Sequence, residues 1–521
     1  MITRLCSAAV AGIDGFEVQV EVDARQVMDA ARVTVVGLPD AAVRESVQRV
    51  SSALSNSSFF RPADLLVTVN LAPADVKKQG PGFDLPMAIG LEMAIQMNYE
   101  AVPEQLRRAV PGRMEDWCLV GELALDGQVR GVRGVLPIAV AARAAGRRFL
   151  MVAAENAAEA AVVEGLTVYG VHHLREAWEV LLDPLRFAPA LPPPAQESVV
   201  AGLDFSDVKG QVFARRAMEI AAAGGHNLLM CGSPGSGKSM LASRLPSILP
   251  PLSMEESLQC SKIHSVCGLL SDVQGPMRER PFRAPHHTIS DVGLMGGGAH
   301  ITPGEITLAH HGVLFLDELP EFSRRTLETL RQPLENGHVT ISRASGSVDF
   351  PCAFMLVAAM NPCPCGYLGD PRHACRCSPA DVARYRRKIS GPLLDRFDML
   401  IDVPPVDPVS LLDKPQGESS EVIRERVVAA RERQAQRYAG LGVDCNARLS
   451  GRLLQRFCAL TVKQKELLLQ AVHELALSAR AFDRILRVAR TIADLAGREQ
   501  LADGDLYEAI QFRQFENQIK A

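Results

Sequence analysis

The sequence predicts an α/β fold, and three short apolar runs carry this prediction. Leu228 to Cys231 leads into a glycine-rich turn and then into a helical start at Met240. Gly312 to Leu316 is followed directly by two acidic residues, and Phe354 to Met360 is followed by an asparagine. Apolar runs of this length, bounded by glycine or polar residues and alternating with helical patterns, are typical of buried strands.

The first run opens the segment NLLMCGSPGSGKS, which fills the pattern G-x-x-x-x-G-K-[ST] between a strand and a helix. The glycines let successive backbone N–H groups face one centre, and the helix adds the positive end of its dipole. We therefore expect nucleotide phosphates here, with Lys238 reaching the β- and γ-phosphates and Ser239 holding Mg²⁺. The predicted nucleotide-binding residues are Gly232, Ser233, Pro234, Gly235, Ser236, Gly237, Lys238, Ser239, Met240 and Asp317.

The second and third runs end in residues that an ATPase needs. Asp317, at the tip of the second strand, can bind the Mg²⁺ shell, and Glu318 is placed to polarise the attacking water as a general base. Asn361, after the third strand, can hydrogen-bond the γ-phosphate or that water. The sequence contains no base-recognition motif for guanine, and the adjacent glutamate favours an ATPase over a switch-type GTPase. ATP and Mg²⁺ are the predicted cofactors.

Length and composition set broad limits on the protein. A chain of 521 residues predicts about three domains. Its formal net charge of −4 means that any nucleic-acid contact must come from local basic clusters. Twelve cysteines without a secretory leader suggest reduced thiols and a cytoplasmic location. No uninterrupted apolar run is long enough to span a membrane.

The pattern along the chain predicts an N-terminal α+β domain over 1–185, a proline-rich linker over 186–200, an ATPase core over 201–405 and a helical lid over 406–521. The linker is placed at DPLRFAPALPPPAQE, whose five prolines stiffen an extended segment. Pro404, Pro405 and Pro408 mark the second boundary. In the first domain we expect strands over 18–22, 31–36, 65–70, 148–152 and 166–171, and helices over 40–56, 84–95 and 136–145.

The N-terminal segments GFEVQVEVD, VGLPDAAVRES, VTVNLAPAD, GPGFDLPMAIG and GVRGVLPIAVAARAAG resemble the N-terminal domain of magnesium-chelatase-like proteins. This resemblance implies the fold of the Lon protease's catalytic domain. A serine–lysine protease needs a Ser nucleophile and a Lys base. Here Gly82 stands where the Lon-like pattern has Ser, and Arg133, which stays charged, stands where the lysine would lie. Proteolysis is therefore disfavoured, and we expect a binding or assembly module.

Two segments between the ATPase motifs are candidates for contact with a substrate. The insert 281–302 contains three successive glycines and the pair His286 and His287, so we expect a polar, mobile loop. Two histidines are too few for a closed metal site. Val339 to Arg343 and Ser347 to Phe350 flank a glycine turn, which predicts a β-hairpin with Arg343 at its tip. Arg343 could grip a phosphate backbone, and an exposed hairpin with a solvated arginine is the alternative.

A cluster of thiols follows the third strand, in NPCPCGYLGDPRHACRCS. Two C-x-C pairs provide enough thiolates for one tetrahedral Zn²⁺, and four protein ligands would make the site structural because no position stays open for water. Reduced free thiols and a redox-labile pair are the alternatives, and His373 could replace one ligand. The predicted zinc ligands, over 363–377, are Cys363, Cys365, Cys375 and Cys377.

Basic residues come next along the chain. Arg386, Arg387 and Lys388 form a local cluster that could follow DNA phosphates, and a solvated helix face is an equal alternative. Arg396, in GPLLDRFD, is expected to enter the nucleotide site of a neighbouring subunit and stabilise the charge of the transition state. This role requires an oligomeric ring.

One more arginine is expected to respond to the nucleotide. The run 477–490 has helical periodicity, and its arginines fall on more than one face. Arg480 is best placed to close over the γ-phosphate as a second sensor, with Arg484 as the next candidate. A lid that carries such an arginine moves with the state of the nucleotide. Salt-bridged surface arginines are the alternative.

Over essentially its full length, the chain resembles the ComM/YifB subfamily of magnesium-chelatase-like AAA+ ATPases, through PFRAPHHTIS, GEITLAHHGVLFLDELPEF, AAMNPCPCGY, ISGPLLDRFD and SARAFDRILRVARTIADL. TISRASG and LLDRFD are also similar to the replicative MCM helicases. The resemblance implies a hexameric, ATP-driven DNA helicase or translocase that promotes branch migration during the integration of transforming DNA, with recombination proteins as further partners. Similarity to chelatase subunits implies an alternative, a motor that remodels a protein partner.

Overall fold

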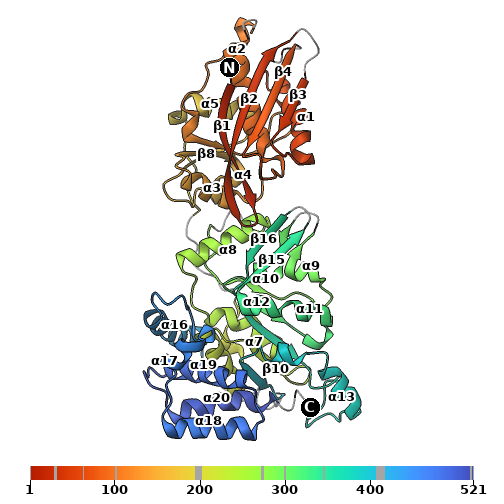
Figure 1. The fold of residues 1–521 in the computed structure, drawn as a ribbon, viewed down its shortest axis with the longest axis vertical. Coiled ribbons are helices and arrows are strands. Elements are labelled where there is room, and N and C mark those ends of the chain that lie inside the picture. The colour runs from red at the N-terminus through yellow and green to blue at the C-terminus, as the bar shows by residue number, and fades with distance from the viewer. Residues whose placement is uncertain are drawn as a thin grey trace. The chain divides into compact units, whose positions relative to one another are not determined.

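The computed structural model describes residues 2–27, 32–60, 62, 64–99, 102–193, 202–270, 275–298, 301–343, 346–405, 417–516 and 519. The chain forms two compact units, of which the first comprises 1–197 and 257–277 and the second 198–256 and 278–521 (Figure 1). The expected core and lid thus belong to one unit. The segment 257–277, which the sequence pattern places in the core, belongs to the first unit instead. Residues 194–200 of the expected linker lie outside the described residues.

The first unit is built on a seven-stranded sheet in the order β3-β4-β2-β1-β5-β8-β9. The pairs β1/β2 and β2/β4 are antiparallel, whereas β3 pairs with β4, and β5 pairs with β1 and β8, in parallel. Alternate side chains of β2, including Val18, Val20 and Val22, are fully buried, as expected for a strand with one face on the core. The strands are β1 (Ile2–Ala11), β2 (Asp14–Gln26), β3 (Arg32–Val36), β4 (Leu65–Ala72), β5 (Trp117–Leu119), β6 (Glu122–Leu123), β7 (Val129–Arg130), β8 (Phe149–Ala153) and β9 (Thr167–Val171).

The helices of this unit pack on the sheet. α1 begins at Ala41 because the carboxylate of Asp40 accepts the backbone N–H of Val43 at 2.9 Å. Arg49 on α1 reaches the buried Asp84 at the start of α2, with 2.7 Å between Nε and Oδ2. The strands and helices expected over 1–185 are confirmed with shifted ends, whereas the sequence pattern does not predict β1, β5, α4 or α5. The helices are α1 (Ala41–Asn56), α2 (Asp84–Asn98), α3 (Val135–Ala144), α4 (Ala154–Ala160) and α5 (Leu174–Leu182).

The segment 257–277 is held in the first unit by polar contacts of α8 (Met254–Val266). The backbone N–H of Gly134 donates to the carbonyl oxygen of Ser265 at 3.1 Å, and the hydroxyl of Ser265 donates to the carboxylate of Glu159. The same carboxylate accepts the backbone N–H of Leu136 at 3.0 Å. These partners lie more than a hundred residues from α8 in the sequence, so local pattern could not assign the segment correctly.

The second unit contains a five-stranded sheet in the order β11-β14-β17-β10-β18, and its paired strands are parallel. The strands are β10 (Leu228–Cys231), β11 (Phe282–Arg283), β14 (Val313–Leu316), β17 (Met355–Met360) and β18 (Met399–Asp402). All residues of β10, β14 and β17 are buried, which explains why these strands read as continuous apolar runs. The three strands expected from the sequence are therefore neighbours, and their carboxyl ends meet at one edge, where ligands bind in such sheets.

Short helices and two hairpins accompany this sheet. Residues 323–335 have helical spacing in the sequence, but they belong to two helices, because the ring of Pro333 is incompatible with the carbonyl four residues earlier. The hairpin of β15 (His338–Arg343) and β16 (Gly346–Pro351) is confirmed, although 344–345 lie outside the described residues. The other elements are α6 (Val212–Gly224), α7 (Lys238–Arg244), α9 (Asp291–Met295), β12 (Gly296–Gly297), β13 (Thr302–Pro303), α10 (Glu305–Leu308), α11 (Arg324–Thr329), α12 (Arg331–Asn336), α13 (Pro379–Arg386) and α14 (Gly391–Leu394).

The insert 281–302 differs from the loop that its composition suggests. Its described part contains a helix, α9, with a fully buried Leu294, and the short antiparallel pair β12/β13. The hydroxyl of Ser290 caps α9 by accepting the backbone N–H of Gly293 at 3.1 Å. Gly296 and Gly297 thus form a short strand rather than part of an unstructured loop.

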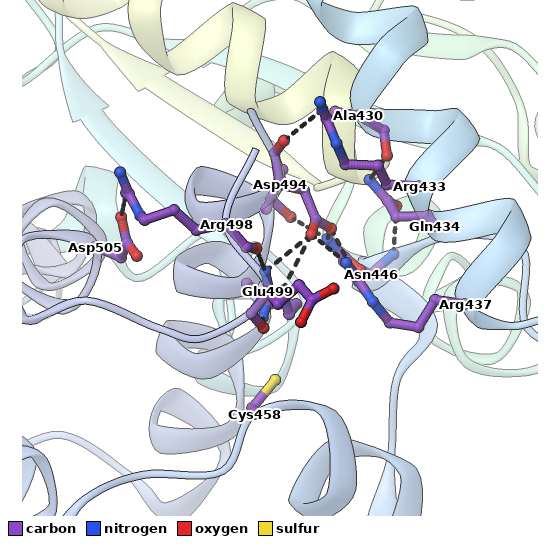
Figure 2. A network of polar contacts seen from close by, with 12 residues as sticks. Ala430, Arg433, Gln434, Arg437, Asn446, Cys458, Asp494, Arg498, Glu499 and Asp505 are labelled. Carbon is purple, nitrogen blue, oxygen red and sulfur yellow. Dashed lines mark hydrogen bonds and ion pairs between the residues drawn. The ribbon is translucent and has the colours of Figure 1, made fainter. Parts of the chain in front are cut away.

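The C-terminal part of the second unit is helical, as expected. Asp494 on α19 is fully buried and accepts hydrogen bonds from Arg437, Asn446 and Arg490 at 2.9, 2.9 and 3.2 Å (Figure 2). This network joins α16 to α19. Residues 406–416, which include Pro408 of the expected boundary, lie outside the described residues. The helices are α16 (Ser420–Arg437), α17 (Gly451–Phe457), α18 (Val462–Glu474), α19 (Ala479–Leu495) and α20 (Asp503–Gln514).

Among the described residues, none of the helices combines the length and the apolar character needed to cross a bilayer.

Candidate nucleotide-binding site

The glycine-rich loop joins β10 to α7 in the expected way. A Cβ on Gly232 would lie 2.3 Å from the carbonyl oxygen of Val403, so only glycine fits there. Gly237, at φ +92°, ends the loop in the left-handed region that favours glycine. These two positions bring the loop close to the sheet edge and turn it into the helix.

Lys238 occupies the centre of the loop. Its ammonium group donates hydrogen bonds to the carbonyl oxygens of Gly232 and Ser233, at 2.7 and 3.0 Å. Only 8% of the residue is exposed, and burial lowers the pKa of Lys238 against the opposing effect of the nearby Cys231 and Asp317. A cation shielded in this way interacts strongly with an anion that enters the loop.

The two acids of the second strand meet the loop. The hydroxyl of Ser239 donates to Oδ2 of Asp317 at 2.6 Å, so the two predicted magnesium ligands are in direct contact. Glu318 has a left-handed backbone, with φ +51°, and its side chain is 54% exposed. Non-glycine residues in this region of backbone space are uncommon and cluster at functional sites.

Asn361 completes the group at the carboxyl edge of the sheet. Its Oδ1 lies 3.4 Å from Nζ of Lys238 and accepts a hydrogen bond from it. The contact arises because β17 lies between β14 and β10 in the sheet. The structure therefore places Lys238, Ser239, Asp317 and Asn361 in one connected set.

Two residues of this site were not among the predicted site residues. His287 follows β11, and its Nδ1 lies 3.3 Å from Oε2 of Glu318. The amide of Gln211 donates to the carbonyl oxygen of Ser236 at 3.1 Å and to that of Pro404 at 2.6 Å. β11 spans only two residues, so the sequence shows no alternation of apolar and polar residues from which this strand, and with it the position of His287, could be predicted. β11 pairs with β14 in parallel, so the segments that follow the two strands leave the sheet at the same edge, and this sheet order is the signal that brings 287 near 318.

The four predicted cysteines form one cluster, with their sulfur atoms within 4.8 Å of one another. The Sγ atom of Cys363 lies 3.4 Å from that of Cys365 and 3.7 Å from that of Cys375, and the latter two are 3.6 Å apart. Zinc–sulfur bonds of about 2.3 Å in a tetrahedron require sulfur–sulfur distances of about 3.8 Å. The cluster thus has the donor atoms and the size of a metal site. His373 is not part of the cluster, because its Nδ1 lies 3.6 Å from Oδ1 of Asp370.

The thiols of the cluster differ in acidity. Backbone hydrogen bonds from Arg376 and Tyr367 lower the pKa of Cys365 to about 6. A hydrogen bond from the backbone N–H of Cys365 acts to lower the pKa of Cys377. Burial and the neighbouring thiols outweigh this effect and raise the pKa of Cys377 to about 12. Thiolates this close repel one another, so the cluster holds four thiolates only when a cation balances them.

Arg396, Arg480 and Arg484 line one cavity of about 470 Å³, together with Arg448 and Arg487. The guanidinium of Arg396 pairs with the carboxylate of Glu335, and only 8% of Arg396 is exposed. Arg484 is buried and donates to the carbonyl oxygen of Phe397 at 2.6 Å, while burial lowers the pKa of Arg484 to about 10.

Arg480 differs from its neighbour Arg484. Its side chain is 60% exposed and lies 3.8 Å from a carboxylate oxygen of Asp395. Residues 232–240 of the glycine-rich loop do not line the cavity. The structure thus groups Arg480 with Arg396 rather than with the glycine-rich loop of the same chain.

The predicted DNA-contacting residues have different surroundings. Arg343 ends β15, and its guanidinium lies 3.4 Å from the position of a Cβ on Gly297, so the hairpin lies against β12. Arg386 donates to the carbonyl oxygen of Pro362 at 3.3 Å, and Lys388 pairs with Glu321 at 3.2 Å. Arg387 caps the end of α13 and is exposed.

Comparison with known proteins agrees with this organisation. The chain matches the family models described as magnesium chelatase, subunit ChlI, over 204–411, subunit ChlI of Mg-chelatase over 20–156, and the subunit ChlI C-terminal region over 417–513. It is 44% identical to the YifB protein of Salmonella typhimurium and 44% identical to the competence protein ComM of Haemophilus influenzae, each over 92% of this chain and 91% of the relative. The DNA replication licensing factor Mcm2 of Drosophila melanogaster is 21% identical over 60% of this chain and 35% of that protein. The chain therefore belongs to the ComM/YifB subfamily of the magnesium-chelatase-like AAA+ proteins.

Proposed function

We propose that this protein is an ATPase that drives movement along DNA, and that it promotes branch migration during the integration of transforming DNA. The observation that carries the ATPase part is the connected set of Lys238, Ser239, Asp317 and Asn361 at one edge of a parallel sheet. Lys238 binds the phosphates, and Ser239 and Asp317 would hold Mg²⁺, which neutralises charge on them. Glu318 accepts the proton of the attacking water.

The active form in this proposal is a ring of identical subunits, with six as the number that the family resemblance implies. Arg396 and Arg480 line a cavity whose five arginines exceed its acids Glu335, Asp398 and Asp483. The glycine-rich loop does not line this cavity, so in this proposal its arginines contact the nucleotide that is bound by a neighbouring subunit. There they stabilise the charge that develops on the transferred phosphoryl group.

DNA is the proposed substrate, with Arg343 as the main contact. Arg343 ends a hairpin strand, where its charge can meet a phosphate. The contacts of Arg386 with Pro362 and of Lys388 with Glu321 give those two residues a structural role, so Arg387 is the remaining DNA candidate of that cluster. The printed name of the Haemophilus influenzae relative, a competence protein, supports the link to transformation.

We also propose that the four cysteines bind one structural Zn²⁺. The sulfur–sulfur distances of 3.4 to 3.7 Å and the purely thiol donor set support zinc over harder cations such as Mg²⁺. Four protein ligands leave no position for a reacting water, so the metal stabilises the loop that carries it.

The decisive experiment measures the steady-state ATPase rate with no DNA, single-stranded DNA, duplex DNA and a four-way junction. Lys238→Ala should abolish nucleotide binding, and Glu318→Gln should bind ATP without hydrolysing it. Arg343→Ala should retain the basal rate and lose the stimulation by DNA. Turnover retained in both motif variants would refute the ATPase assignment.

A rate that is indifferent to every DNA would favour the second candidate, a motor that remodels a protein. One observation supports that candidate, since the chain is 27% identical over 31% of its length to the magnesium-chelatase 67 kDa subunit of Heliobacterium mobile. Branch migration itself is tested separately, by measuring the ATP-dependent conversion of a labelled four-way junction into duplex products without strand cleavage.

A further inference from the structure

We propose that the four-cysteine site sets the affinity for nucleotide, because the loop it closes forms a wall of the glycine-rich phosphate loop. This inference rests on the ATPase and zinc assignments proposed above. The wall consists of residues 363–377, which are called the cysteine loop below. Three contacts join the cysteine loop to the nucleotide site.

The first contact is between Gly366 and Pro234. A Cβ built on Gly366 would lie 2.7 Å from both Cγ and Cδ of Pro234, so the backbone of the cysteine loop packs directly on the ring of a phosphate-loop residue. Gly366 is buried and has φ +85°, a conformation that favours glycine. Gly366 follows the ligand Cys365, so a metal bound by that thiolate fixes the position of this contact.

The second contact involves Asp370, a carboxylate in the middle of the cysteine loop. Its side chain is 1% exposed and accepts the backbone N–H groups of Arg372 and His373 at 2.8 and 3.2 Å. These backbone hydrogen bonds, and also the hydroxyl of Ser233 in the phosphate loop, lower the pKa of Asp370. Oδ2 of Asp370 and Oγ of Ser233 are both shielded from solvent, and neither atom has a hydrogen-bond partner among the described residues. The carboxylate is thus close enough to feel the hydroxyl of Ser233, although the two groups form no hydrogen bond.

The third contact runs through Asn361, which precedes the ligand Cys363 by two residues. Oδ1 of Asn361 accepts from the ammonium of Lys238 at 3.4 Å. Pro362 lies between Asn361 and Cys363 in the sequence, and its carbonyl oxygen accepts a hydrogen bond from Arg386 of α13 at 3.3 Å. The cysteine loop thus begins two residues after Asn361, which touches Lys238, and ends at Cys377, two residues before α13.

The metal closes a loop that has no regular secondary structure. The described residues of the cysteine loop form no helix or strand, so its conformational entropy is restrained mainly by the closure at the four thiolates. Without the metal the loop samples other conformations, and the positions of Pro234, Ser233 and Asn361 are less restricted. Nucleotide binding must then order them, which weakens affinity.

Linkage makes this inference quantitative. If zinc raises the affinity for nucleotide by a given factor, nucleotide must raise the affinity for zinc by the same factor. Couplings of this kind are commonly about 5- to 150-fold. A merely structural metal that stabilised a distant part of the fold would show no such reciprocity.

The test uses the full-length protein and measures bound zinc by elemental analysis together with the Kd of a fluorescent ATP analogue in Mg²⁺. Cys375→Ser should lose zinc and raise the Kd about tenfold. Asp370→Asn, which keeps all four thiols, should retain zinc and still raise the Kd. Two control variants, Cys267→Ser and Asp126→Asn, change a thiol and a turn carboxylate in the first unit and should alter neither quantity.

The outcomes separate this inference from those beneath it. Loss of zinc with an unchanged Kd would overturn the coupling and leave the zinc and ATPase assignments standing. A wild-type protein that holds no zinc would overturn both the zinc assignment and the coupling, whereas failure to bind nucleotide would overturn the ATPase assignment as well. Where Cys375→Ser does not fold, removal of zinc from the wild-type protein by a chelator and its re-addition supply the same comparison. The zinc affinity measured with and without ADP then tests the reciprocity.

Discussion

Nδ1 of His287 lies 3.3 Å from Oε2 of Glu318, the proposed general base. The imidazole comes from the loop after β11, and its ring also meets the edge of Phe322 at 6.4 Å. The contact occupies a carboxylate oxygen that would otherwise be open to the attacking water. The pair therefore restrains the side chain of Glu318.

The first prediction concerns this restraint. His287→Ala should raise the basal ATPase rate about two- to fivefold, the range expected for a partly exposed pair, and should reduce the further stimulation by DNA. The measurement is kcat with and without DNA. His286→Ala is the matched control, since Nδ1 of His286 pairs with the hydroxyl of Thr288 at 2.9 Å instead. A fall in kcat would show that His287 assists the reaction rather than restraining it.

The second prediction follows from the cavity that Arg396 shares with Arg480. Arg396→Ala should lower kcat by about 10³-fold or more, the effect of removing an arginine supplied by a neighbour. Lys238→Ala is also expected to be inactive alone, but a one-to-one mixture of the two variants should regain activity. In rings assembled at random, about a quarter of the interfaces combine an intact Lys238 from one subunit with an intact Arg396 from its neighbour. The measurement is the ATPase rate against mixing ratio.

A control shows which subunit each arginine serves. Arg480→Ala mixed with Lys238→Ala should recover activity in the same way if Arg480 acts across the interface. A mixture that stays inactive at every ratio would place the arginine in the site of its own subunit.

The third prediction concerns the lid. Asp494→Ala should lower the free energy of unfolding by about 3–5 kcal/mol, because it leaves the buried Arg490 and the half-buried Arg437 without their acid. Asn446→Ala, which removes one hydrogen bond to the same carboxylate and also those to Tyr438 and Thr491, should cost less, about 1–3 kcal/mol. Denaturant midpoints of the two variants check this order. Equal effects would indicate that packing, rather than charge, dominates the network of Figure 2.

The fourth prediction is a pH dependence of stability. His310 is buried, and its Nδ1 accepts the backbone N–H of Ala353 at 3.0 Å. Burial, and next the charges of His311 and Arg448, lower the pKa of His310 from 6.5 to about 3. The unfolded chain therefore binds a proton near pH 6.5 that the folded protein does not bind until about pH 3.

The sign of the effect follows from this difference. The contribution of His310 is fully present above pH 6.5 and is lost as the pH falls toward 3, at about 1.4 kcal/mol per pH unit. His310→Gln, which cannot take up a proton, should show a flatter decline of unfolding free energy between pH 6.5 and 4.5. Parallel profiles of the two proteins would contradict the assignment, whatever their difference at pH 7.

Local pattern was sufficient wherever the residues concerned are neighbours in the chain. The phosphate loop was predictable because strand, glycines, Lys238 and helix follow one another without interruption, and the cysteine cluster because its four thiols lie within fifteen residues. The hairpin that carries Arg343 was predictable for the same reason. Helix ends were less predictable. The break before Pro333 shows why, because this one proline interrupts an otherwise continuous helical pattern.

The sequence by itself determined the local groups of the candidate sites, namely the glycine-rich loop, the paired acids and the cluster of four thiols. Only the tertiary structure decided which groups work together. It placed His287 against Glu318, grouped Arg480 with Arg396, brought Asp370 to Ser233, and moved 257–277 into the first unit. The physical reason is the same in each case. These contacts join residues distant in the chain, and their energy depends on strand order and burial rather than on the spacing of residue types.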